Sequence, residues 1–142
     1  MSAQNKALTR RVFEELFSQN RLDVVDELFA ADYHDHDPVN EEDTRGPDGV
    51  REEIGSYIAG SSDAKFTVED QIAEGDRVVT RWVARGTHDG ELFGVEATGN
   101  TFEVHGITIH RVAGGRIQEG WWNWDVLGMM RQIGAIAAEQ TA

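Results

Sequence analysis

The spacing of apolar residues changes near residue 61 of this 142-residue chain, and this change constrains the fold more than any other feature. Before it, apolar residues recur every three to four positions, as on one face of an α-helix. After Ser61 and Ser62, apolar and polar residues alternate, as in strands with one buried face. The sequence therefore predicts an α+β fold in one domain, 1–142, with helices on one side of an antiparallel sheet.

The first part of the chain predicts three helices. The first covers residues 4–19 and the second residues 22–30, followed by a short extended piece at 33–38 and a polar loop that ends at Arg45. Gly46-Pro47-Asp48 is expected to start the third helix, because proline in the first turn sacrifices no hydrogen bond. The apolar residues that define the helical faces are Leu8, Val12, Phe13, Leu16, Phe17, Leu22, Val25, Leu28, Phe29, Val50, Ile54, Tyr57 and Ile58.

The second part predicts strands and one closing helix. Strands are expected around residues 66–72 and at 77–88, 101–112 and 116–124, and a helix at 126–136. Turns are expected at 73–76 and 113–115, and a glycine-punctuated connection at 89–100. A strongly twisted sheet wrapped around a helix leaves a cone, whose mouth is the natural place for a ligand.

Acidic residues outnumber basic ones by 26 to 13, which gives a formal net charge of −13 at pH 7. Such a protein repels polyanions, so neither nucleic acid nor an anionic membrane is expected as a partner. The chain has no cysteine, which excludes disulfides and thiolate chemistry. The polar first residues, and the lack of an apolar run long enough to span a membrane, favour a cytoplasmic location.

The predicted last strand carries the strongest candidate site. Three tryptophans fall within four positions, and an aspartate, Asp125, follows them. Strict alternation places Trp121, Asn123 and Asp125 on one face, which we interpret as a pocket wall. Desolvation by aromatic walls would raise the pKa of Asp125 and suit it to acid–base work. The alternative is that Asp125 only caps the helix that follows it.

Several spaced motifs carry a resemblance to a known family. They are Ala31-Asp32-Tyr33, His36-Asp37-Pro38, Gly46-Pro47-Asp48-Gly49, Gly86-Thr87-His88, His105-Gly106-Ile107, Gly115-x-Ile117-x-Glu119-x-Trp121 and Asp125-x-Leu127-Gly128. Together they resemble the SnoaL-like polyketide cyclase (ester cyclase) family. The resemblance implies a nuclear-transport-factor-2-like (NTF2-like, cystatin-like) cone with an internal pocket. It also implies intramolecular aldol ring closure of a bulky apolar carbonyl or ester substrate, with no metal and no organic cofactor.

The resemblance also implies catalytic residues. Asp125 matches the family's acid–base aspartate, and its partner is a histidine on the preceding strand, either His105 or His110. If residues 113–115 form a three-residue turn, Val112 pairs with Arg116 and His105 shares a face with Asp125, which favours His105. A slip of one residue would exchange the two histidines.

Other residues are candidates for contact with substrate. Asn123 could donate to a carbonyl oxygen. His88 could contact substrate or organise its loop, and Trp82 could be part of the pocket or of the core. The complete set is His36, Tyr57, Trp82, His88, Phe93, Trp121 and Asn123.

His34 and His36 invite comparison with a metal site, because two histidines two residues apart on a strand share a face and can hold zinc or iron. No third ligand has metal-site spacing, so we expect no metal.

Trp122 and Trp124 would lie on the outer face of the sheet. Buried aromatic residues with little charge suit an interface between protomers, so we expect a homodimer. The alternative to an enzyme is a non-catalytic protein that uses the same cone to bind a small molecule.

Overall fold

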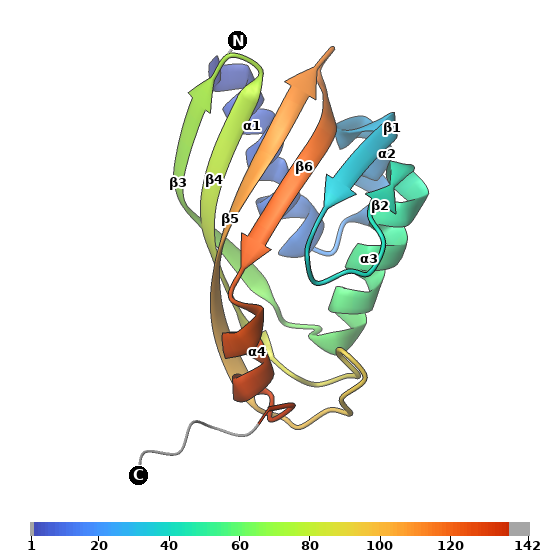
Figure 1. Ribbon diagram of the computed structural model, residues 1–142, viewed down its shortest axis with the longest axis vertical. Coiled ribbons are helices and arrows are strands. Elements are labelled where there is room, and N and C mark those ends of the chain that lie inside the picture. Colours follow the sequence, from blue (N-terminus) through green and yellow to red (C-terminus); the bar gives the residue numbers. More distant parts are fainter. Residues whose placement is uncertain (1, 137–142) are drawn as a thin grey trace.

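The structure is a computed structural model and describes residues 2–136. A curved six-stranded sheet has the strand order β2-β1-β6-β5-β4-β3, and α1, α2 and α3 lie on one side of it (Figure 1). The elements are α1 (Ser2–Arg11), η1 (Val12–Phe17), η2 (Leu22–Val24), α2 (Val25–Leu28), β1 (Phe29–His36), β2 (Thr44–Arg45), α3 (Gly46–Gly60), β3 (Lys65–Glu74), β4 (Arg77–Thr87), β5 (Thr101–Ala113), β6 (Arg116–Trp124) and α4 (Val126–Gln132).

The predicted α+β order is confirmed, with differences at the ends of elements. The first helix changes from α to π geometry at Val12 and ends at Phe17. The second helical segment ends at Leu28, because Phe29 adopts an extended conformation and begins β1. The third helix begins at Gly46 and has proline in its first turn, as its sequence predicts.

The sheet is mixed, which corrects the prediction of a purely antiparallel one. β1 lies parallel to β6, and its other neighbour, β2, runs antiparallel to it. The remaining pairs, β3–β4, β4–β5 and β5–β6, are antiparallel as predicted. β1 precedes the antiparallel strands β3 to β6 in the sequence and pairs with the last of them, β6.

The turn between β5 and β6 is shorter than predicted, and its length determines which residues of β5 face the inside of the fold. Gly114 and Gly115 have φ of 59° and 74° and form a two-residue turn closed by Ala113 opposite Arg116. Positive φ at both positions is what the favoured hairpin turn requires. The predicted three-residue turn is therefore wrong.

A β-bulge in β6 follows this turn. Val112 lies opposite Ile117 but Arg111 lies opposite Glu119, so Gln118 is the extra residue. The bulge shifts the alternation by one position. Ile117 is buried, and after the bulge Trp122 points to the concave side while Trp121 and Asn123 lie on the outer face. The predicted assignment of faces in this strand is thus wrong beyond Ile117.

The core fills the concave side of the sheet. Phe13 from η1 packs against Trp122 with ring centroids 5.7 Å apart, and Trp82 lies 5.9 Å from Trp122. Val12, Phe13 and Leu16 are completely buried, so η1 is the element around which the sheet curves. Within residues 2–136, no helix has the length and apolarity needed to cross a bilayer.

Candidate active site

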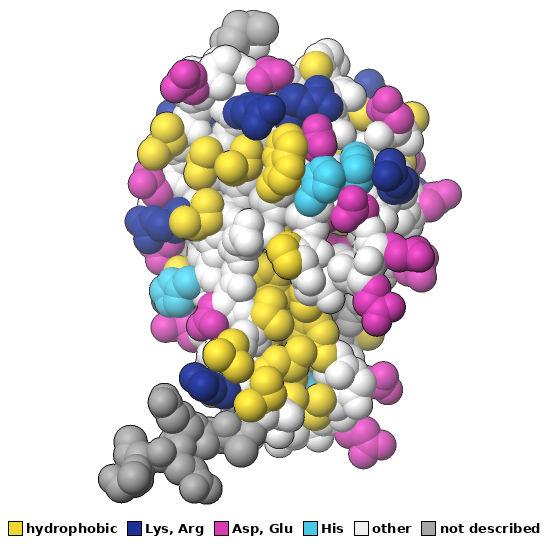
Figure 2. Space-filling view, in the orientation of Figure 1, with side chains coloured by type: hydrophobic (Ala, Val, Ile, Leu, Met, Phe, Trp, Pro, Cys, Tyr) yellow, Lys and Arg dark blue, Asp and Glu magenta, His cyan; other side chains and the backbone are white. Residues whose placement is uncertain are grey.

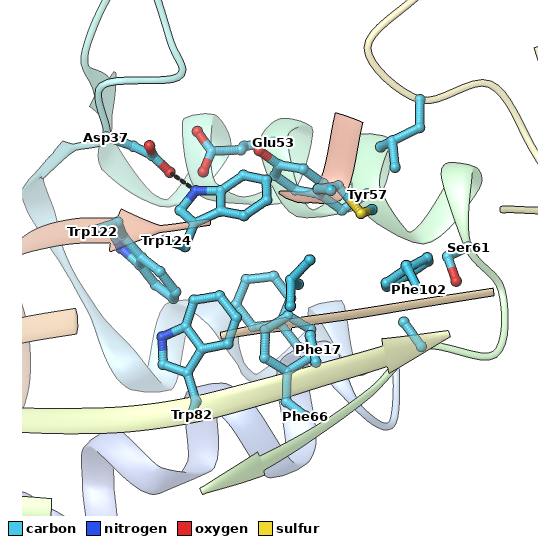
Figure 3. Close-up of a pocket in the computed structure, with 15 residues that line it drawn as sticks. Phe17, Asp37, Glu53, Tyr57, Ser61, Phe66, Trp82, Phe102, Trp122 and Trp124 are labelled. Atoms are coloured by element: carbon cyan, nitrogen blue, oxygen red, sulfur yellow. Dashed lines mark hydrogen bonds between the residues drawn. The ribbon is translucent and has the colours of Figure 1, made fainter. Parts of the chain in front are cut away.

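A cavity of about 80 Å³ lies between the concave face of the sheet and α3 (Figure 3). Most of its wall is aromatic or aliphatic, and its few polar residues include Asp37, Glu53 and Tyr57. The lining residues are Phe17, Asp37, Glu53, Tyr57, Ser61, Ala64, Phe66, Trp82, Ala84, Leu92, Phe102, Val104, Trp122, Trp124 and Met129.

The aromatic wall depends on a glycine beneath it. Trp82 lies across β5, where its indole Nε1 donates to Thr108 Oγ1 at 2.9 Å. A Cβ atom on Gly106 would lie 2.2 Å from the Trp82 ring. Glycine at this position therefore lets the indole lie flat on the neighbouring strand and keeps the cavity open.

Asp37 and Glu53 form the polar end of the cavity (Figure 3). Asp37 directly follows β1, and its Oδ2 accepts a hydrogen bond from Trp124 Nε1 at 3.1 Å. Its Oδ1 accepts from the backbone N–H of Val39, also at 3.1 Å. Burial raises the pKa of Asp37 although both bonds favour its charged form.

Glu53 projects from α3 and is held on one oxygen only. Its Oε2 accepts from Thr44 Oγ1 and, at 2.8 Å, from Asn40 Nδ2. Its Oε1 has no hydrogen-bond partner within residues 2–136. Burial raises the pKa of Glu53, and the nearby charge of Asp37 adds to the shift. This arrangement leaves one carboxyl oxygen free to exchange a proton.

Asp35 lies two residues before Asp37 and, like Asp37, is buried. Its Oδ1 accepts from the Tyr33 hydroxyl at 2.6 Å. Burial raises the pKa of Asp35 to about 8, with smaller contributions in the same direction from Glu53 and Asp37. It is therefore largely protonated at neutral pH and acts as a neutral group beneath the site.

The structure corrects the choice between the two histidines of β5. His105, which the predicted register favoured, lies on the outer face with its side chain 63% exposed, 3.7 Å from Glu103. His110 faces inward and is completely buried, with no partner for either ring nitrogen within residues 2–136. Burial lowers the pKa of His110 to about 3, so its ring is neutral at pH 7.

The structure also corrects the placement of Asp125. Its side chain is exposed and does not line the cavity. Its Oδ1 accepts from the backbone N–H of Gly128 at 2.8 Å, which makes Asp125 the N-cap of α4. The bulge in β6 explains the difference, because it turns Trp122 and Trp124 toward the cavity. The face predicted to line the pocket, which ends at Asp125, therefore points outward.

The other predicted site residues separate into two groups. Tyr57 and Trp82 line the cavity, and Phe93 packs against Tyr57 and Trp124 with ring centroids 5.9 and 6.0 Å away. The rest lie elsewhere: His88 is buried in its loop, bonded to Thr98 Oγ1 at 2.9 Å and Val95 O at 3.1 Å, while His36, Trp121 and Asn123 lie on the outer face.

Sequence reasoning missed Asp37 and Glu53 as site residues. A signal for Asp37 was present, because alternation with the buried Tyr33 and Asp35 puts it on the inner face of β1. Glu53 lies three residues after Val50 and four before Tyr57, on one side of the third helix.

The fold and the cavity define a class of protein: an NTF2-like cone, in which a curved sheet encloses an apolar chamber with a few polar groups at one end. Within that class, the sequence profile of the SnoaL-like polyketide cyclases matches residues 7–133. The chain belongs to the SnoaL-like polyketide cyclase family.

Solved structures agree with this assignment. The chain is similar to IdmH from Streptomyces antibioticus, a proposed polyketide cyclase, with 34% identity over 92% of this chain and 99% of that one, and a TM-score of 0.79. It is also similar to a proposed SnoaL-like polyketide cyclase from Jannaschia sp. CCS1, with 25% identity over 95% and 94% of the two chains and a TM-score of 0.87. TsrD from Streptomyces laurentii shows 27% identity over 96% and 98%, with a TM-score of 0.85. No curated protein matches the chain.

Proposed function

We propose that this protein catalyses acid–base chemistry without a cofactor on a bulky apolar carbonyl or ester compound, either an intramolecular aldol-type ring closure or a related enolisation. One observation supports this most directly: a buried carboxyl group, Asp37, and a half-buried one, Glu53, both with raised pKa values, stand at the end of a cavity with aromatic walls. Aromatic walls suit a polyketide-like ring system. Several similar structures are described as proposed polyketide cyclases, which favours the same substrate class.

The proposed reaction needs a single group that takes up and returns a proton. A base removes a proton from the carbon beside an ester carbonyl, the resulting enolate carbon attacks a second carbonyl carbon, and an acid protonates the new alkoxide. A carboxyl group shielded from water can serve both transfers. A raised pKa makes its carboxylate form a stronger base than an exposed glutamate or aspartate would be.

We assign this role to Glu53, acting through Oε1. Its other oxygen is held by Thr44 and Asn40, which fixes the direction of the free one. Asp37 uses both oxygens as acceptors and so serves to position Trp124 and to raise the proton affinity of Glu53. Burial raises the pKa of Tyr57, so its hydroxyl stays protonated and can donate to a substrate carbonyl oxygen.

The role assigned from sequence to Asp125, with His105 as its partner, is the competing proposal for the same reaction. Both side chains are exposed, and neither lines the cavity. Desolvation, the reason for expecting Asp125 to be a strong base, is therefore absent at its observed position.

Hydrogen exchange at carbon tests the proposal without knowledge of the natural substrate. Aromatic β-keto methyl esters would be incubated with the protein in deuterated buffer, and deuterium incorporation beside the ester carbonyl followed by NMR. We expect the wild-type protein to accelerate exchange and Glu53→Gln to lower that acceleration by about 10²- to 10⁴-fold. Asp125→Asn is the matched carboxylate control and should keep the wild-type rate.

Two results would contradict the assignment. Full exchange activity in Glu53→Gln, with loss of activity in Asp125→Asn, would return the role to Asp125. Esters that raise the melting temperature of the wild-type protein without any accelerated exchange would favour the alternative, a protein that binds a small molecule and does no chemistry.

A further inference from the structure

The outer face of β1 carries a cluster of potential metal ligands away from the cavity. His34 and His36 alternate with buried residues along this strand, so their rings lie side by side, with centroids 4.0 Å apart. Asp43, from the loop that follows β1, places Oδ2 2.7 Å from His34 Nε2 and 3.3 Å from His36 Nδ1. Figure 2 shows adjacent histidine side chains among acidic ones on this face.

We propose that His34 Nε2, His36 Nδ1 and Asp43 Oδ2 bind one divalent transition-metal ion of the zinc type. The three ligand atoms lie within 4.8 Å of one another. Zinc binds imidazole nitrogen and carboxylate oxygen at about 2.0–2.2 Å, so ligand atoms around a tetrahedral ion stand about 3.4 Å apart. Small side-chain movements therefore suffice to admit the ion, and because all three side chains are partly exposed, water can complete its coordination.

A neighbouring carboxylate prepares His36 for this role. Glu119 Oε2 lies 2.7 Å from His36 Nε2, on the side of the ring away from Asp43. A glutamate that accepts the Nε2–H bond fixes the ring tautomer that leaves the Nδ1 lone pair free, as carboxylates behind metal-binding histidines commonly do. Trp121 stacks on the same ring at 5.5 Å with an interplanar angle of 14°, which holds its orientation.

The sequence alone could not complete this ligand set. Asp43 lies nine residues after His34, and only the return of the 37–43 loop toward β2 brings it back to the histidines. The overall charge of −13 favours attraction of cations to the protein.

A bound ion would join the two ends of the 37–43 loop. The same loop supplies Asn40, which holds Glu53, and Thr44 immediately follows it. Metal binding is therefore expected to stabilise the fold locally and raise the melting temperature. This inference does not depend on the proposed reaction, since the site faces away from the cavity.

Zinc titration of the chelator-treated, full-length protein tests the proposal. Isothermal titration calorimetry with ZnCl₂ should show one ion per chain, and the melting temperature should rise with zinc. His34→Ala and Asp43→Asn should abolish both effects, and Glu119→Gln should weaken binding about 10- to 100-fold. The visible spectrum of the cobalt(II) form should show tetrahedral coordination and lose it in His34→Ala.

His105→Ala is the matched control, because His105 is also an outer-face histidine beside a glutamate but has no third ligand among residues 2–136. It should bind zinc as the wild type does, and each variant without zinc should melt close to the metal-free wild type. Failure of the wild type to bind at submillimolar zinc would overturn the proposal. Binding that His34→Ala leaves intact, or that His105→Ala removes, would overturn it equally.

Discussion

Asp35 is a buried acid whose charged neighbours, Glu53 and Asp37, are also acidic, so its protonation ties stability to pH. Its pKa rises from the ordinary value of 3.8 to about 8 in the folded protein. Between those values the folded state holds a proton that the unfolded state has released. This contribution to stability is therefore complete at low pH and is lost as the pH rises toward 8.

The first prediction follows from that sign. Burial lowers the pKa of His110 from 6.5 to about 3, so below about pH 6.5 this residue makes stability rise with pH, opposite to Asp35. The window from pH 6.5 to 8 therefore reports most directly on the buried carboxyls. We expect the free energy of unfolding of the wild type to fall across this window, and that of Asp35→Asn to fall less. The asparagine oxygen can still accept from Tyr33, which keeps that bond. Denaturant unfolding at several pH values measures the difference, and parallel pH profiles for the two proteins would contradict it.

The second prediction concerns Asp125 as a helix cap. Asp125→Ala removes the bond to the Gly128 N–H and should cost about 1 kcal/mol of stability. Asp125→Asn keeps an acceptor at the same place and should cost much less. Thermal and denaturant unfolding provide the comparison, while carbon–deuterium exchange should stay at the wild-type rate in both. Equal stability of the alanine and asparagine variants would show that the cap contributes nothing.

At the level of elements, periodicity predicted most of what was found. The change in apolar spacing located the helices and the four long strands, because each of these elements has one buried face. In the strands, buried and exposed residues alternate as that spacing predicts. The pairing of β1 with β6 could not be predicted this way, since nothing in the 29–36 segment specifies a partner so distant in sequence.

The candidate site was predicted less well, because the hairpin between β5 and β6 differs from its predicted form in turn length and in a bulge. The bulge at Gln118 exchanges the two faces of β6, and with them the roles expected of Trp121 and Trp122. A bulge depends on how both neighbouring strands pack, and no pattern at 117–119 signals it. This error carried Asp125 into the predicted pocket, while the wrong turn length, with Ala113 rather than Val112 opposite Arg116, carried His105 there.

The third prediction tests the close approach of Trp82 to β5. Gly106→Ala places a methyl group against the indole, so the ring must move, at a cost of about 1–3 kcal/mol. The displaced indole should also reshape the cavity and weaken ligand binding. Gly55→Ala is the matched control, because a Cβ there meets nothing within 4 Å and alanine favours the helix by about 0.5–1 kcal/mol. Opposite signs of the two changes in unfolding free energy are expected; two changes of the same sign would contradict this explanation.

The outer face of the whole molecule carries an apolar row that crosses the sheet. Ile72, Val79, Ile109 and Trp121 lie opposite one another on successive strands from β3 to β6. Ile107 lies beside this row, two residues before Ile109 on the same face of β5. Figure 2 shows hydrophobic side chains gathered in a band on this face, and Ile72 and Ile107 are 63% and 49% exposed. The predicted homodimer contacts, Trp122 and Trp124, line the cavity instead. This row is the surface that suits the expected homodimer.

The fourth prediction places the dimer interface on that row. A stable interface buries about 800 Å² on each partner and depends on apolar residues near its centre. The double variant Ile72→Asp/Ile107→Asp adds charge within the row and beside it at exposed positions, so the fold should persist while association is lost. Leu127→Asp adds the same charge at a 49% exposed position on α4, off the sheet, and should leave association unchanged. Sedimentation equilibrium should give twice the chain mass for the wild type and for Leu127→Asp, but a single chain mass for the double variant. A monomeric wild type, or a double variant that still dimerises, would show that this face does not join protomers.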